Sequence, residues 1–260
     1  MKLSKSKVNS YLKCPREFKF QYIDEIETKP NKYMALGSDV HLIAEKFTDK
    51  FEDNLDDIDI NNELIKVANE LDIGYGLDTH IDNLALFFKE VFVDNDYKLF
   101  SNEEYLIDKK HRFSGICDII LEDENSHLVV IDYKTSNSNS FSKYRLELCY
   151  YKLLVENVYH KRVSKVGVFF TKNGRLRLLD VCEEENKRKY LSYSEIDEAI
   201  DTMYDVRDRI NRKEFPKKEQ YLCRYCTYKE LCKDEFYFFR WIIITFNKII
   251  LINLGIPKNL

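Results

Sequence analysis

The chain has 260 residues, 44% of them hydrophobic, which is enough to bury one substantial core. Its formal charge of −4 at pH 7 excludes a protein that binds nucleic acid through a strongly basic overall composition. Basic residues gather in segment 2–19, which carries six of them against one acidic residue. That segment fits either a phosphate-binding patch or a solvated helix face.

No positively charged segment followed by an apolar stretch opens the sequence, so we expect a cytoplasmic protein in a reducing compartment. The apolar tail, 236–260, superficially resembles a membrane span, but Arg240 and Lys248 interrupt it. Charged side chains are costly at the centre of a membrane, so we expect a core-docking or interfacial helix and no membrane partner.

The first hundred residues are predicted to be mainly helical. Apolar residues at helical spacing predict two short helices within 8–22, one helix from 37 through 47, and two more near 62–71 and 81–99. Pro15 can begin the second short helix, directly after Cys14, because proline fits the first turn of a helix.

The middle of the chain favours strands. Three consecutive strands are predicted at 104–107, 113–121 and 127–132, followed by a helix over 142–157. Next comes a hairpin whose strands, 166–172 and 175–181, flank the two-residue turn Asn173-Gly174, and then a helix over 194–212. This order indicates an α/β fold with a mixed sheet flanked by helices, as a single domain over 1–235.

Two acidic residues stand out in the predicted strands. Asp118 lies within an apolar strand pattern, where an ionised carboxylate is costly unless it is paired or bound to a metal. Asp132 ends the next strand, and Lys134 follows on the same face because side chains alternate along a strand. Two carboxylates can hold Mg²⁺ or Mn²⁺ while an ammonium positions water or stabilises phosphorane charge, which favours phosphodiester hydrolysis. The alternative is a strand-end ion pair beside a turn-capping Asp118.

A histidine joins this group of candidates. The segment Gly37-Ser-Asp-Val-His41 places an imidazole about one helical turn beyond a glycine that would permit close approach to the sheet. His41 is therefore a candidate third metal ligand. The alternative is a histidine that is satisfied at the surface or in the core.

Together these segments resemble the RecB-like branch of the PD-(D/E)XK nucleases, through Gly37-Ser-Asp-Val-His41, Gly115-Ile-Cys-Asp118 and Asp132-Tyr-Lys134. The resemblance implies a restriction-endonuclease-like α/β fold. It also implies that His41, Asp118 and Asp132 are metal ligands, that the Tyr133 carbonyl contributes, and that Lys134 is the catalytic lysine.

The same branch usually continues with a Gln-x-x-x-Tyr motif on the following helix. The matching segment here is Glu147-Leu-Cys-Tyr-Tyr151, so Tyr151 fits and Glu147 replaces the glutamine. An acidic group near the metals can alter metal affinity or repel a phosphate. Tyr151 and Glu147 are therefore included among the candidate catalytic residues.

Three of the seven cysteines crowd near the C-terminus, as Cys223, Cys226 and Cys232. Their spacing suits a tetrahedral metal or an iron-sulfur cluster, either of which needs a fourth ligand. Spacing alone leaves that ligand open among four residues, Cys14, Cys117, Cys149 and Cys182.

Iron-sulfur nucleases, such as the AddB nuclease domain and the CRISPR-associated exonucleases, combine one early cysteine with a late group of three. This resemblance implies that Cys14 and the late cysteines hold a [4Fe-4S] cluster, with Zn²⁺ as the alternative. The cluster would clasp the N-terminal helices to the C-terminal segment.

The resemblance implies a metal-dependent DNA nuclease that acts as an exonuclease on single-stranded DNA or DNA ends. It also implies a role in CRISPR adaptation or recombination-type repair. Expected partners are DNA, CRISPR adaptation proteins and a helicase subunit, since the sequence has no phosphate-binding loop of its own. An alternative is a nucleic-acid-binding or assembly subunit that keeps the fold and has weakened catalysis. A third possibility is an interaction protein stapled by zinc.

Overall fold

The computed structural model describes all residues except 1, 29–31, 56, 74, 137–140 and 234–260. The predicted tail helix at 236–260 lies outside the described residues. The chain divides into two compact units, one of residues 1–8 and 29–208, the other of residues 9–28 and 209–260. The expected single nuclease domain over 1–235 stays a prediction. No helix of the described residues is both long and apolar enough to cross a membrane.

Helices precede and follow the strands, as predicted. They are α1 (Lys5–Lys13), α2 (Pro15–Tyr22), α3 (Lys32–Phe51), α4 (Ile60–Glu70), α5 (Asp78–Phe88), α6 (Arg145–Tyr159) and α7 (Tyr193–Asn211). Shorter turns of other helical types are η1 (Lys89–Asp94), η2 (Phe141–Tyr144) and η3 (Tyr221–Tyr225).

Six strands form one mixed sheet in the order β1-β2-β3-β4-β5-β6. They are β1 (Lys98–Asp108), β2 (Phe113–Glu122), β3 (Leu128–Lys134), β4 (Val163–Phe170), β5 (Arg175–Cys182) and β6 (Tyr190–Ser192). The β3–β4 and β5–β6 pairs are parallel, and the other neighbours are antiparallel. A parallel pair needs a crossover, which α6 supplies between β3 and β4. The mixed sheet flanked by helices confirms the predicted α/β class.

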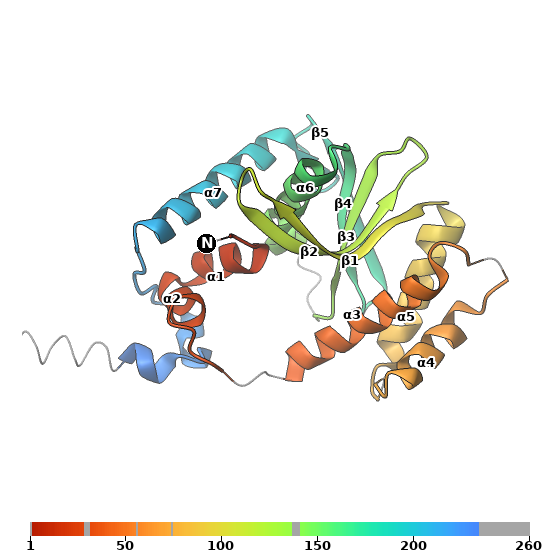
Figure 1. The fold of residues 1–260 in the computed structure, drawn as a ribbon, viewed down its shortest axis with the longest axis horizontal. Helices are drawn as coiled ribbons and strands as arrows, with labels where there is room; N and C mark the ends of the chain where they lie inside the picture. The colour runs from red at the N-terminus through yellow and green to blue at the C-terminus, as the bar shows by residue number, and fades with distance from the viewer. Residues whose placement is uncertain (1, 29–31, 56, 74, 137–140, 234–260) are drawn as a thin grey trace, which may run out of the picture. The chain divides into compact units, whose positions relative to one another are not determined.

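Helices α3, α4 and α5 gather on one side of the sheet (Figure 1). Their apolar residues form one buried cluster with alternate residues of the central strands. Strand residues in this cluster include Ile119, Leu121, Val129, Ile131 and Phe169. Their period of two on β2 and β3 is the reason that one face of these strands belongs to this core.

Helix α6 packs against β1, β2 and β4. A Cβ atom at Gly115 would lie 3.4 Å from the Leu154 side chain, which is still an ordinary van der Waals distance. The hydroxyl of Tyr150, on α6, donates to the carbonyl oxygens of Leu3 (2.6 Å) and Ser114 (2.9 Å). Leu3 also forms a parallel bridge with Phe113. The N-terminal segment is therefore fixed against the start of β2 just before α1 begins.

Two predicted helices had wrong boundaries. Gly37 lies inside α3 rather than before a helix, because the apolar pattern of α3 extends in front of it. The helix predicted over 81–99 ends at Phe88 and continues only as the π-helical turn η1, and Lys98 already begins β1. Asp96, with a φ of 50°, occupies the left-handed region that stops the helical path.

The hairpin of β4 and β5 was predicted correctly, but its turn was not. Phe170 pairs with Arg175, so the loop has four residues, ending at Gly174 with a φ of 59°. The Thr171 backbone N–H donates to the Lys134 carbonyl (3.0 Å) and so keeps Thr171 beside β3. Thr171 therefore belongs to the loop instead of pairing with β5. Gly174 still supplies the left-handed backbone that a hairpin turn needs.

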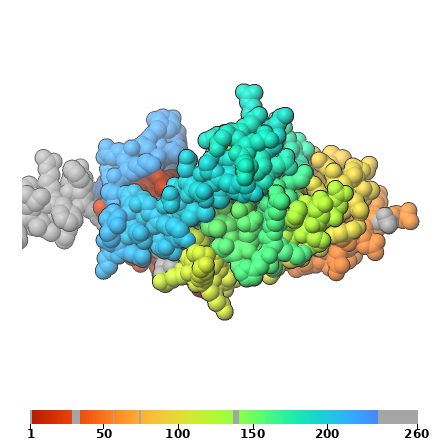
Figure 2. Space-filling model, turned by 90° about the horizontal axis from the view of Figure 1, so that it is seen from above, coloured from red at the N-terminus to blue at the C-terminus, as the bar shows by residue number. Residues whose placement is uncertain are grey.

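Strand β6 was not predicted, because it has only three residues and no alternation to detect. It follows the charged segment 183–189, whose residues are all exposed and project from the surface (Figure 2). Arg145 holds this strand, because its guanidinium donates to the Tyr190 carbonyl (2.7 Å) and pairs with Glu195. A long-range contact of this kind leaves no local pattern in the sequence.

Asp108, at the end of β1, offers a test of the fold. Its buried carboxylate accepts hydrogen bonds from the His111 backbone N–H (3.0 Å) and the Asn157 amide (2.7 Å). Burial opposes ionisation, but these bonds and the His111 ring hold the pKa of Asp108 below its ordinary value. A lowered pKa contributes stability that is present at neutral pH and is lost as the pH falls through the folded-state value.

We predict that Asp108→Asn lowers the free energy of unfolding at pH 7 by about 1–3 kcal/mol, because charged hydrogen bonds are lost. The difference from the original protein should shrink as the pH falls below about 4. Urea unfolding at several pH values measures it. Asp180→Asn is the control, since Asp180 is 56% exposed and forms a surface ion pair of small expected value. Equal destabilisation by both variants would contradict the role of Asp108.

Candidate active site

Asp118 and Asp132 lie on adjacent antiparallel strands. Ile119 pairs with Ile131, and the next position of the same register places the two aspartates opposite each other. Both are buried, with 7% and 2% of their surface exposed. Two carboxylates buried side by side repel each other, so the surrounding residues must offset their charge.

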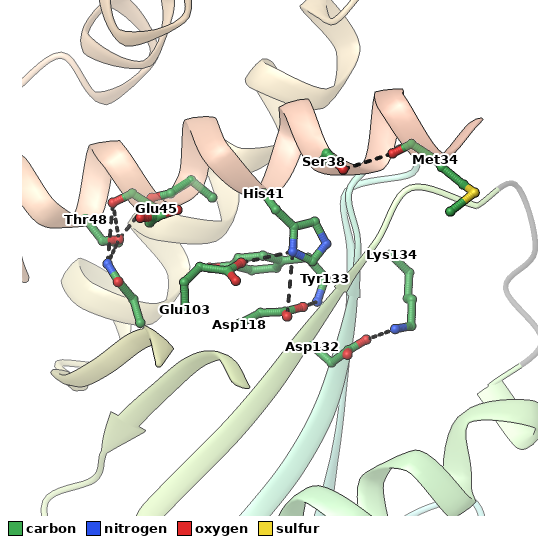
Figure 3. A network of polar contacts seen from close by, with 12 residues as sticks. Met34, Ser38, His41, Glu45, Thr48, Glu103, Asp118, Asp132, Tyr133 and Lys134 are labelled. Carbon is green, nitrogen blue, oxygen red and sulfur yellow. Dashed lines mark hydrogen bonds and ion pairs between the residues drawn. The ribbon is translucent and has the colours of Figure 1, made fainter. Parts of the chain in front are cut away.

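Asp118 is held by the chain and faces His41. One carboxylate oxygen, Oδ2, accepts the Tyr133 backbone N–H at 2.6 Å. The other, Oδ1, lies 3.6 Å from His41 Nδ1. His41 comes from α3, and its Nδ1 also contacts Glu103 Oε1, on β1, at 3.0 Å (Figure 3). The Tyr133 ring packs edge-on against the His41 ring, with centroids 5.7 Å apart, and so helps to orient it.

His41, Glu103 and Asp118 each offer a ligand atom within 4.8 Å of the others, and no other described histidine, cysteine, aspartate or glutamate residues form such a group of three. Imidazole nitrogen and carboxylate oxygen suit Mg²⁺ or Mn²⁺. The donor set therefore fits a divalent cation. A cavity of about 480 Å³ lies beside it, between α3 and β1, and is lined in part by His41 and Glu103.

The charged side chains of this group shift one another's pKa values. Burial opposes protonation of His41, but Asp118 and Glu103 raise the pKa of His41 to about 9. Burial and the neighbouring Asp132 raise the pKa of Asp118 to about 7. These carboxylates thus stabilise the protonated form of His41, as they would stabilise a bound cation.

Asp132 lies between two lysines. Its Oδ1 accepts from Lys5 Nζ at 3.0 Å, and its Oδ2 forms an ion pair with Lys134 Nζ (Figure 3 shows the second pair). Burial disfavours the charged form, yet Lys134 and Lys5 hold the pKa of Asp132 at about 2. Burial also opposes protonation of both lysines, whose pKa values Asp132 nevertheless raises.

Glu147 and Tyr151, one helical turn apart on α6, complete the site. Glu147 Oε2 lies 3.6 Å from both Lys5 Nζ and Lys134 Nζ. Tyr151 is buried, and Lys5 Nζ lies 4.8 Å from the centre of its ring. The segment predicted from the Gln-x-x-x-Tyr pattern therefore does lie beside Asp132 and Lys134.

The structure brings all the predicted site residues of the first unit together, but it groups them differently. Asp132 lies with the lysines, and Glu103 takes the third position beside His41 and Asp118. Glu103 and Lys5 were not predicted as site residues. Glu103 has a φ of 42°, which breaks the alternation of β1, and Lys5 reaches the site only through a long-range contact. No motif or periodicity in the neighbouring sequence marks either residue, apart from its charge.

Gly37 contributes less than expected. It lies near the end of β3, where an added Cβ would meet the Thr135 hydroxyl at 3.7 Å. That is an ordinary van der Waals distance, so α3 could approach the sheet equally well with alanine. The close approach itself agrees with the prediction, and the need for glycine does not.

In the second unit, the four predicted cysteines line one pocket of about 200 Å³. None of the seven cysteines forms a disulfide. Two chain segments meet around the pocket, because the Tyr11 hydroxyl donates to the Glu214 carbonyl (2.5 Å) and Arg16 Nε to the Phe215 carbonyl (3.0 Å). Within the described residues no three cysteine sulfurs lie within 4.8 Å of one another. Cys117 and Cys149 are buried within β2 and α6.

Comparison with protein families gives a match to the PD-(D/E)XK nuclease superfamily over residues 2–233. No curated protein sequence matches significantly. The crystal structure of SSO0001 is 13% identical, with a TM-score of 0.37, over 88% of this chain and 92% of that one. A candidate exonuclease from Eubacterium rectale is 9% identical, with a TM-score of 0.45, over 86% of each chain. These scores are too low to support an argument, so the assignment rests on the family match over nearly all described residues: the chain belongs to the PD-(D/E)XK nuclease superfamily.

Proposed function

We propose that this protein is a metal-dependent deoxyribonuclease that hydrolyses phosphodiester bonds, acting as an exonuclease on single-stranded DNA or DNA ends. The observation that carries the proposal is the presence of Asp118, Asp132 and Lys134 side by side in a chain of a nuclease superfamily. Members of this superfamily use divalent metals, and the donor set of the site fits one.

His41 and Asp118 would hold the cation, with Glu103 and Asp132 as further carboxylates and the Tyr133 carbonyl as the contribution implied by the resemblance. When bound, Mg²⁺ or Mn²⁺ supplies Lewis-acid activation of the phosphoryl group and of water.

The residues of the chain supply positioning and charge. Asp132 stays ionised at neutral pH because the lysines beside it hold its pKa at about 2. Lys134 stays protonated, since burial is outweighed by Asp132 and Glu147, which raise its pKa. Its ammonium can donate to a phosphate oxygen or position the attacking water. The Tyr133 N–H keeps Asp118 directed toward His41.

We predict that Asp132→Asn and Lys134→Met each reduce DNA cleavage by about 100-fold or more, because each removes charge aimed at the reacting phosphate. Cleavage of labelled single-stranded and double-stranded DNA with Mn²⁺ measures the effect. Removing the metal with a chelator should also stop cleavage.

The chain contains a matched control, since Asp96-Tyr97-Lys98 repeats the Asp-Tyr-Lys triplet at the surface. The Asp96 and Lys98 side chains are 82% and 61% exposed and form an ion pair at 2.8 Å. Asp96→Asn and Lys98→Met should leave cleavage unchanged. Full activity in both Asp132→Asn and Lys134→Met would refute the assigned centre.

The alternative function is a nucleic-acid-binding or assembly subunit with weakened catalysis, favoured by the acidic Glu147 in place of glutamine. It predicts tight DNA binding without cleavage in any divalent metal. Measurement of DNA binding and product formation on the same preparation separates the two functions.

We further propose that Cys14, Cys223, Cys226 and Cys232 hold a [4Fe-4S] cluster. The thiolate donor set suits either an iron-sulfur cluster or zinc. One Zn²⁺ with bonds of about 2.3 Å brings its sulfurs to roughly 4 Å of one another. No three of the cysteine sulfurs in the described residues lie within 4.8 Å of one another. Basic residues line the same pocket, including Arg16, Lys217 and Lys229, and would offset the negative charge of a thiolate-bound cluster.

We predict that protein purified without oxygen is brown, with broad visible absorbance and about four irons and four sulfides per chain. Cys226→Ser should lose most of this absorbance. Cys182→Ser is the control, because Cys182 ends β5 and does not line the pocket. A colourless protein with one equivalent of zinc would establish the alternative.

The pathway is part of the proposal, as CRISPR adaptation or recombination-type repair. The resemblance supports it, and the partners would be CRISPR adaptation proteins or a helicase subunit. Affinity purification of the tagged chain from its own cells should recover proteins of one of these classes, and recovery of neither would count against the pathway.

A further inference from the structure

Lys5 enters the candidate site from a part of the sequence that carries none of the nuclease motifs. It lies in the first turn of α1, 127 positions before Asp132, and its Nζ lies 3.0 Å from Asp132 Oδ1. The same ammonium lies 3.6 Å from Glu147 Oε2 and 4.8 Å from the centre of the Tyr151 ring. Only 18% of the Lys5 side chain is exposed.

Hydrogen bonds fix the backbone just before Lys5. The position of the Lys5 ammonium therefore does not result only from the flexibility of a long side chain. The Leu3 N–H donates to the Arg112 carbonyl and the Leu3 carbonyl accepts from the Ser114 N–H, both at 3.0 Å. The Tyr150 hydroxyl, from α6, donates to the same Leu3 carbonyl. Strand β2 and helix α6 together fix the backbone just before Lys5, from which its side chain reaches Asp132.

The buried carboxylate of Glu147 requires a positive charge nearby, such as that of Lys5. Its Oε2 is buried and has no hydrogen-bond partner, so the carboxylate depends on the two ammonium groups at 3.6 Å. An unpaired buried carboxylate is strongly unfavourable. Lys134 alone brings one positive charge against the two carboxylates of Asp132 and Glu147, so a second ammonium is needed to offset both.

The charges of the site balance only when Lys5 is counted. Glu103, Asp118, Asp132 and Glu147 bring four negative charges. Lys134 and one bound divalent cation, with a neutral His41 as its ligand, would bring three positive charges. Lys5 brings the fourth, and without it a negatively charged phosphodiester would meet a site of the same sign.

We propose that Lys5 is a positioning residue of the nuclease site, a second lysine that offsets Glu147 and allows the site to accept a phosphodiester. The inference rests on the proposed nuclease function and adds that Lys5 and Glu147 act as one pair. Glutamate at position 147 is then compatible with activity.

Charge compensation tests the pair, with Lys5→Met, Glu147→Gln and the two combined. Lys5→Met should weaken the affinity for a short single-stranded DNA, measured with Ca²⁺, by about tenfold and tighten Mn²⁺ binding by about threefold to tenfold, because one positive charge is lost. Glu147→Gln should weaken Mn²⁺ binding. The combined variant should return both affinities to within about twofold of the original protein. Lys5→Arg, which keeps the charge, should stay close to the original.

In Lys5→Met, DNA binding should weaken while Mn²⁺ binding tightens. These opposite changes distinguish the loss of a charge from damage to the fold, since a misfolded site would bind both metal and DNA less tightly. Thermal unfolding of each variant checks folding independently. Lys2→Met, which removes an exposed charge from the same segment, is the control and should change neither affinity.

A combined variant that keeps the lowered DNA affinity of Lys5→Met, or unchanged affinities in Lys5→Met, would overturn the proposal. Failure of the nuclease function is a separate outcome, because it appears as absence of DNA cleavage in the original protein. The Mn²⁺ titrations still measure the coupling of Lys5 with Glu147 in that case.

Discussion

The burial of two carboxylates on adjacent strands is the constraint on which the site depends. Asp118 and Asp132 face each other across β2 and β3, and both are almost completely covered. Two such charges can remain in a folded protein only if other groups offset them. His41 does so for Asp118, and Lys134 and Lys5 do so for Asp132. The site is thus a set of charges that stabilise one another.

The fold brings these charged side chains together from several elements. Helix α3 carries His41 over the edge of the sheet, β1 brings Glu103 beside it, and α6 presents Glu147 from the opposite direction. Because α6 is also the crossover between β3 and β4, one element both closes the parallel pair and completes the site. The β3–β4 core and the chemistry therefore depend on the same helix.

Periodicity and motifs in the sequence predicted those features of the site that depend on residues close together in the chain. Strands β2 and β3, the shared face of Asp132 and Lys134, and the helix at Glu147 all follow from periodicity or motif. Lys5 and Glu103 did not, because contacts between residues far apart in the chain and a left-handed backbone leave no periodic trace. The same reason explains why β6, held by side chains of α6, was missed.

Metal binding by this set of groups is the central claim, and its geometry can be observed directly. Diffraction from crystals soaked in Mn²⁺, with anomalous scattering to locate the ion, gives that observation. We predict one Mn²⁺ bonded to His41 and to the Asp118 carboxylate, with Glu103 or Asp132 as a further ligand. A protein that cleaves DNA with Mn²⁺ but binds the ion away from His41 and Asp118 would contradict it.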